Sequence, residues 1–171
     1  MDRDAVHRWQ TAYDAAGIRT GAAPPVSLLE LVAEADHIVT SAMRRAVASA
    51  ERLAPTRPIR QSDLLRETPL PIPEWPTRLP FSGWSLARHS TWMYQILRGV
   101  DASERERARA SEAATMLTGI AADGSTVLVV THGVFRRLVG RELIDRGWKS
   151  LGRRGGYQHW SAWSFAGPDK L

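Results

Sequence analysis

The segment VLVVTHG, from Val127 to Gly133, constrains the fold of this chain more than any other stretch. Its apolar residues match a strand covered on both faces, as in the centre of a parallel sheet. The pattern predicts this strand over residues 126–131 and a helix over residues 134–146 directly after it. Thr131-His132-Gly133 therefore falls at the carboxyl end of a strand, where open α/β sheets bind their ligands.

A second strand, predicted over residues 37–41 (HIVTS), ends in the same way. The helix predicted after it, over residues 43–53, carries Arg45 on its first turns. Because the carboxyl ends of neighbouring parallel strands meet at one edge of a sheet, we expect Ser41 and His132 to lie near each other. The alternatives are a hydrogen-bonded core histidine and a surface arginine on an amphipathic helix.

A third motif, Leu65-Arg66-Glu67, follows a stretch predicted to be extended over residues 58–65. A carboxylate near arginines is either a structural ion pair or a general acid that protonates a leaving oxygen. Guanidinium groups and the N–H groups of a helix N-terminus both favour anions. Together the three motifs predict a phosphate-handling pocket formed by Ser41, Arg45, Glu67, His132 and Gly133.

The remaining patterns complete an α/β arrangement. Further helices are predicted over residues 4–16, after a capping box at Ser27, over residues 90–97, and from a capping box at Ser103 to residue 120; a late strand is predicted over residues 157–165. This order favours a mostly parallel sheet with helices on both faces, in a single domain over residues 1–171. The segment at about 68–92, rich in proline and tryptophan, is interpreted as an ordered lid.

Composition excludes several classes of function. The chain has no cysteine, so disulfides and thiolate metal sites are ruled out. Its 23 basic residues include only two lysines, and its net charge is +5. The arginines reflect either a GC-rich genome or an anionic partner; without a nucleic-acid-binding motif, we do not expect nucleic acid to be that partner. No apolar run approaches a membrane span and no signal-peptide core begins the chain, so we expect a cytoplasmic protein with no membrane partner.

The three motifs, read in order, resemble the histidine phosphatase superfamily. These are Ser-x-x-x-Arg-Ala-x-x-Ser-Ala over residues 41–50, Leu-x-Glu over 65–67, and the strand with Thr-His-Gly over 127–133. The resemblance covers nearly the whole chain and implies the phosphoglycerate-mutase-like fold, which includes broad phosphatases and α-ribazole phosphatase. It implies hydrolysis of phosphate monoesters through a phosphohistidine, without a metal or cofactor.

The resemblance also implies roles for individual residues. Arg45 would clamp phosphate, His132 would be the second histidine that stabilises the transition state, and Glu67 would protonate the leaving alcohol. Ser41 and Gly133 would complete the phosphate site. The substrate would be a small phosphorylated molecule of undefined identity. The choice between mutase and phosphatase stays open, although the short chain and lid favour a phosphatase.

One departure from the family pattern bears on activity. The family's nucleophile lies in an Arg-His-Gly motif that ends an interior first strand, and this sequence has no such motif: of its five histidines, only His132 precedes glycine. In-line attack argues against His132 as a substitute nucleophile. We therefore expect an N-terminally shortened version of a longer protein, with weak or absent turnover. The alternative is a natural pseudoenzyme that binds phosphorylated ligands or proteins. An uncovered sheet edge would also favour a homodimer.

Overall fold

The computed structural model describes residues 1–19, 21, 23–75, 78–100 and 102–168. In chain order its elements are α1 (Arg3–Ala15), α2 (Val26–Ala33), β1 (His37–Ser41), α3 (Arg44–Leu53), β2 (Arg60–Ser62), the 3-10 helix η1 (Asp63–Leu65), α4 (Phe81–Leu97), α5 (Glu104–Ile120), β3 (Val127–Val130), α6 (Gly133–Asp145), β4 (Lys149–Arg154) and β5 (Ala162–Ala166). Within those ranges, no helix combines the length and the apolar character needed to cross a membrane.

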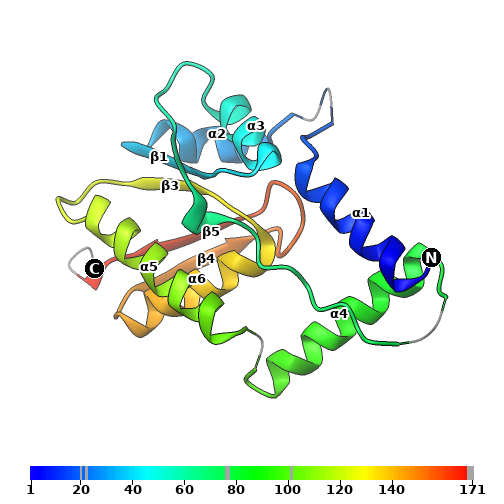
Figure 1. Cartoon of the computed structure of the whole chain (residues 1–171). Coiled ribbons are helices and arrows are strands. Elements are labelled where there is room, and N and C mark those ends of the chain that lie inside the picture. Colours follow the sequence, from blue (N-terminus) through cyan, green and yellow to red (C-terminus); the bar gives the residue numbers. More distant parts are fainter. Residues whose placement is uncertain (20, 22, 76–77, 101, 169–171) are drawn as a thin grey trace.

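A parallel sheet of three strands, in the order β2-β1-β3, forms the centre of the fold. Val39 of β1 is in register with Arg60 of β2 on one side and with Val129 of β3 on the other. Strands β4 and β5 form a separate antiparallel hairpin. Helices flank the parallel sheet, with α2 and α3 on one side and α5 and α6 on the other (Figure 1). The fold class predicted from the sequence is confirmed.

Alternating residues of β1 and β3 build the two cores, because successive side chains of a strand point to opposite faces. Val39, Val127 and Val129 pack with buried residues of α5 and α6. Ile38, Leu128 and Val130 pack with buried residues of α2 and α3. The apolar residues of β3 therefore pack into the cores on both faces of the sheet, as the sequence indicated.

The position of β3 within the sheet differs from the prediction. The central strand is β1; in the described part of the chain, β3 is an edge strand whose four residues are all only half-buried. The β4–β5 hairpin lies beyond that edge without pairing to it. Phe165 of the hairpin packs on the α5–α6 side, and Trp160 packs on the α2–α3 side. The prediction failed because an apolar run reports two covered faces and carries no information about the two edges.

Some local predictions also need correction. Half of the capping box at Ser103 is confirmed: the Ser103 hydroxyl accepts a hydrogen bond from the Glu106 N–H at 3.2 Å, whereas the Glu106 carboxylate bonds Arg109 and Thr68. The one at Ser27 is wrong: α2 begins at Val26 after Pro25, with no side-chain cap. The late strand β5 is shorter than predicted, and β4 was not predicted at all. Every residue of β4 is exposed, so it lacks the apolar alternation that would have indicated a strand.

The second half of the predicted lid is a helix. Helix α4 begins at Phe81 rather than at residue 90, directly after Pro80 at its N-cap, and spans 17 residues. Together with α1 it forms a helical pair set to one side of the sheet (Figure 1). The Trp84 indole N–H donates to the Met1 carbonyl at 2.8 Å, and Trp9 packs edge-on against Phe81. Residues 76 and 77 of the lid segment lie outside the described residues.

Candidate functional site

Ser41 and His132 meet at the carboxyl ends of β1 and β3. Their side chains are hydrogen-bonded, with 2.9 Å between His132 Nε2 and Ser41 Oγ. Ser41 is fully buried and His132 is 8% exposed. The expectation that these two residues lie together is confirmed, and its physical reason holds: adjacent parallel strands end at the same edge of the sheet.

The hydroxyl of Ser41 holds the ring of His132 through Nε2. Ser41 Oγ accepts the Met43 N–H at 3.2 Å and still has its own proton to donate to His132 Nε2. When Ser41 donates in this way, Nε2 accepts and Nδ1 carries the ring proton. Burial lowers the pKa of His132 to about 3, and the positive charges of Arg45, Arg66 and Arg109 add to the effect. His132 is thus a neutral hydrogen-bond donor at neutral pH.

Arg45 lies on the first turn of α3 and is held by the end of α1. Its guanidinium donates to the Tyr13 carbonyl at 3.2 Å, lies 3.4 Å from a carboxylate oxygen of Asp14, and stacks 4.6 Å from the centre of the Tyr13 ring. The Arg45 side chain is 13% exposed. The α1 contacts orient this guanidinium near His132, and an anion that reaches it must compete with the partly exposed carboxylate of Asp14.

Glu67 is held against the first turn of α6. Its Oε1 accepts the backbone N–H groups of Phe135 and Thr68, each at 3.0 Å. Burial raises the pKa of the Glu67 carboxyl, while these backbone donors act in the opposite direction. A carboxyl with a raised pKa suits proton donation to a leaving oxygen, the role predicted for Glu67.

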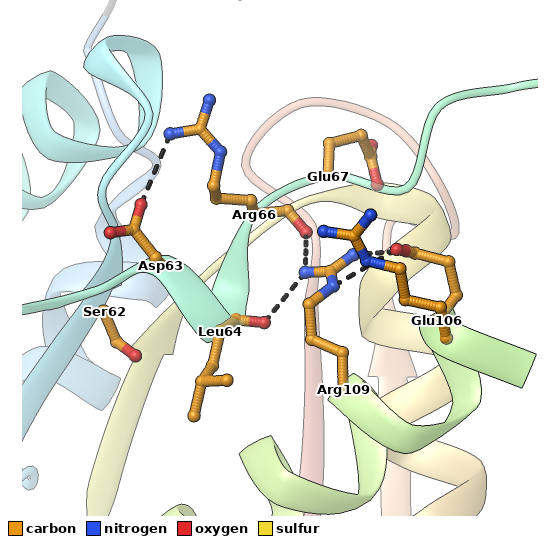
Figure 2. A pocket seen from close by; sticks show the side chains of 8 residues that line it. Ser62, Asp63, Leu64, Arg66, Glu67, Glu106 and Arg109 are labelled. Carbon is orange, nitrogen blue, oxygen red and sulfur yellow. Dashed lines mark hydrogen bonds and ion pairs between the residues drawn. The ribbon is translucent and has the colours of Figure 1, made fainter.

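The loop that carries Glu67 is supported by α5. Arg109 donates to the Leu64 carbonyl at 2.9 Å and to the Arg66 carbonyl at 2.7 Å, and it is also paired with Glu106 (Figure 2). These residues line a cavity of about 630 Å³. The cavity is lined by Ser62, Asp63, Leu64, Arg66, Glu67, Arg105, Glu106 and Arg109. Glu67 is the predicted site residue that lines it, and the opposite charges of the lining side chains largely compensate one another.

The sequence-predicted residues converge on the N-terminus of α6. Gly133 begins that helix, His132 precedes it, Ser41 is bonded to His132, and Glu67 caps it. Arg45 is near enough for its charge to depress the pKa of His132. A guanidinium and a helix N-terminus are groups that favour anions, and here they lie around a buried neutral imidazole. Among the described residues, no group of three or more histidine and acidic side chains is placed to hold a metal ion.

Sequence reasoning missed the residues that support this site. Asp14 and Tyr13 reach Arg45 from a helix that carries no motif, so no local signal marked them. Arg136 of α6 donates to Ser161 and Gly156 in the loop between β4 and β5. Its spacing of four residues from His132, on one face of a helix, was the available signal.

The remaining histidines lie elsewhere. All four are exposed. His7 is on α1, His37 begins β1, His89 is on α4, and His159 is in the loop between β4 and β5. None of these positions follows the carboxyl end of a parallel strand. Among the described residues, His132 is therefore the one histidine that lies at the end of a parallel strand.

Comparison with known proteins identifies the class. The family model of the histidine phosphatase superfamily (branch 1) matches residues 27–161, which contain all five predicted site residues. The chain belongs to this superfamily, and that membership supports a phosphatase-type function. A crystal structure of a phosphoserine phosphatase mutant from Entamoeba histolytica, in complex with phosphoserine, is similar at 17% identity and a TM-score of 0.47; the match covers 82% of this chain and 80% of that chain. No curated protein matches the sequence.

Proposed function

We propose that this chain is a phosphate monoester hydrolase of the histidine phosphatase type, acting on a small phosphorylated molecule, and that turnover by its 171 residues is weak or absent. The observation that carries the proposal is the buried pair of Ser41 and His132 at two parallel strand ends, with Arg45 near enough for its charge to lower the pKa of His132. These groups offer donors to the equatorial oxygens of a phosphoryl group. The proposal needs no metal or cofactor.

Each residue has a defined part in this proposal. Arg45 exchanges its contact with Asp14 for the phosphoryl oxygens, where a planar guanidinium binds in a bidentate manner. His132 donates from Nδ1, and Ser41 keeps the ring in the tautomer that allows it. Glu67 supplies the proton for the leaving alcohol. What the described residues do not provide is an opposed nucleophile, because His132 is already a stabilising donor.

The open edge of β3 supports the expectation of weak turnover. A strand added in parallel to that edge would end beside His132, because parallel strands place their carboxyl ends together. Such a strand is the element through which this sheet would deliver a second histidine. Within the described residues this edge is unpaired. The proposed pocket then has Arg45 to bind phosphate and Glu67 to donate a proton, but no nucleophile.

The experiment is phosphate binding by the purified chain, with Arg45→Ala compared with the neighbouring exposed Arg44→Ala. We expect inorganic phosphate or vanadate to raise the thermal midpoint of the wild-type chain and of the Arg44 variant. The Arg45 variant should bind at least about tenfold more weakly, the loss typical of a charge-assisted contact. Equal binding by both variants would remove the basis of the proposal.

Turnover is measured on an aryl phosphate in parallel. The expected rate is at or near background for the wild-type chain. A clear rate that both His132→Ala and Arg45→Ala abolish would contradict the part of the proposal that concerns weak turnover, and would show that the pocket contains a functional nucleophile.

A second candidate function is a pseudoenzyme that binds phosphorylated ligands or proteins without chemistry. The observation that favours it is the exposure of aromatic residues along the lid: Trp75 is 50% exposed and Phe81 is 49% exposed. The test adds a peptide strand that ends in histidine to the β3 edge. Phosphate binding that still occurs without turnover after this addition would favour the pseudoenzyme. Recovery of turnover on such addition would favour the hydrolase.

A further inference from the structure

An exposed tyrosine lies at the rim of the candidate site. Tyr157 belongs to the loop between β4 and β5 and is 53% exposed. A Cβ built on Gly133 would lie 3.4 Å from Cδ1 of the Tyr157 ring, which is ordinary van der Waals contact. Because Gly133 follows His132 directly and begins α6, the phenol ring lies against the first turn of the helix that forms the anion site.

Two tryptophans fix the orientation of this ring. The Trp92 indole of α4 meets it edge to face, with 5.7 Å between ring centres and an interplanar angle of 89°. The Trp163 indole of β5 meets it at 5.7 Å and 72°. Aromatic pairs prefer such edge-to-face arrangements. Tyr157 is therefore held between the lid helix and the hairpin, yet half of its surface remains open.

Arg136 ties the loop to α6. Its guanidinium donates to the Ser161 carbonyl at 2.9 Å and to the Gly156 carbonyl at 2.7 Å, and it stacks 4.3 Å from the centre of the Trp163 ring. Arg136 follows His132 by one helical turn, so one helix positions both the imidazole and the loop that carries Tyr157. The open ring is thereby pre-organised beside the anion site.

The proton donor lies on the same turn of α6. Glu67 accepts the N–H of Phe135. Phe135 lies two residues after Gly133, and Tyr157 packs against Gly133. A leaving oxygen that takes its proton from Glu67 would therefore lie near the first turn of α6, the turn against which Tyr157 packs.

We propose that Tyr157 forms a wall of the leaving-group subsite, and that this site prefers phosphate monoesters whose alcohol carries a flat ring. The inference rests on the proposed function, since it requires phosphate to bind at Arg45 and His132. Stacking of a ligand ring on the phenol should increase affinity about 3- to 10-fold over an ester without a ring. Residue Tyr157 is then a specificity determinant and takes no part in the chemistry.

The test is a set of dissociation constants, measured by calorimetry, for inorganic phosphate, methyl phosphate and phenyl phosphate. The variants are Tyr157→Ala, Tyr157→Phe and, as a matched control, Tyr94→Ala, which removes a tyrosine that is 60% exposed on α4. We expect phenyl phosphate to bind more tightly than methyl phosphate in the wild-type chain, the Phe variant and the control. In Tyr157→Ala the two esters should bind equally, with the affinity for inorganic phosphate unchanged.

The outcomes separate this inference from the proposed function. If inorganic phosphate binds in an Arg45-dependent manner but the two esters bind equally in the wild-type chain, the inference is wrong and the proposed function stands. The same conclusion follows if Tyr157→Ala keeps the preference for phenyl phosphate. If inorganic phosphate does not bind at all, the proposed function fails and the subsite fails with it.

Discussion

His132 is a neutral base inside the folded protein, and its burial couples stability to pH. Burial lowers its pKa from 6.5 to about 3. Between these values the unfolded chain binds a proton at this position and the folded chain does not, so protonation favours unfolding. His132 should therefore reduce the free energy of unfolding progressively as pH falls from 6.5 towards 3, by at most about 1.4 kcal/mol per pH unit. Above pH 6.5 the effect is absent.

Urea denaturation at pH 7, 6, 5 and 4 measures this effect, with His132→Gln as the comparison. Glutamine retains hydrogen-bonding capacity towards Ser41 and cannot titrate. The variant should lose part of the decline in stability between pH 6.5 and 4 that the wild-type chain shows, while the contribution of the carboxylates is common to both. Parallel pH profiles for the two proteins would mean that His132 is not held neutral by burial.

The sequence predicted individual site residues where a strand end fixed their place. Ser41 and His132 could be paired because the sheet topology follows from the motif order, and Glu67 could be brought near them by the resemblance. The partners of Arg45 could not be predicted. Asp14 lies 31 positions away on α1, and its contact depends on how α1 packs, which periodicity does not report.

Two glycines allow a test of packing at the level of the elements. Gly119, near the end of α5, is exposed, and a Cβ added there would have nothing within 4 Å, whereas a Cβ on Gly140 in α6 would lie 3.0 Å from Phe165 Cζ. Alanine favours a helix over glycine by up to about 1 kcal/mol. We expect Gly119→Ala to raise the free energy of unfolding by up to that amount, and Gly140→Ala to lower it by about 1 kcal/mol or more because the Phe165 ring must move.

Chemical denaturation of both variants shows whether each substitution raises or lowers the free energy of unfolding. A further variant, Gly140→Ala with Phe165→Leu, removes the crowded ring and should recover part of the loss. Stabilisation by Gly140→Ala alone would show that the hairpin is not packed tightly on α6, which would also weaken the case that Arg136 and this packing hold the loop that carries Tyr157.

The whole molecule combines a parallel sheet and a hairpin that share cores without sharing hydrogen bonds. Apolar periodicity was enough to predict most of the helices, the strands β1 and β3, and their two covered faces, but it missed the first half of α4. It was not enough to predict which strand lies at an edge, since edge pairing is made by the backbone. The proposal of weak turnover depends on the same edge, because the unpaired edge of β3 leads to His132.

Hydrogen exchange tests this architecture. Strand β1 is paired on both sides, whereas in the described residues β3 pairs only with β1. Because successive N–H groups of a parallel strand alternate in direction, about half of those in β3 face the open edge. We expect residue-resolved exchange by NMR to be at least about 100-fold faster for these amides than for those of β1, through local rather than global opening. Uniform protection of β3 would mean that the edge is covered; if tenfold dilution restored fast exchange, the cover would be a second copy of the chain.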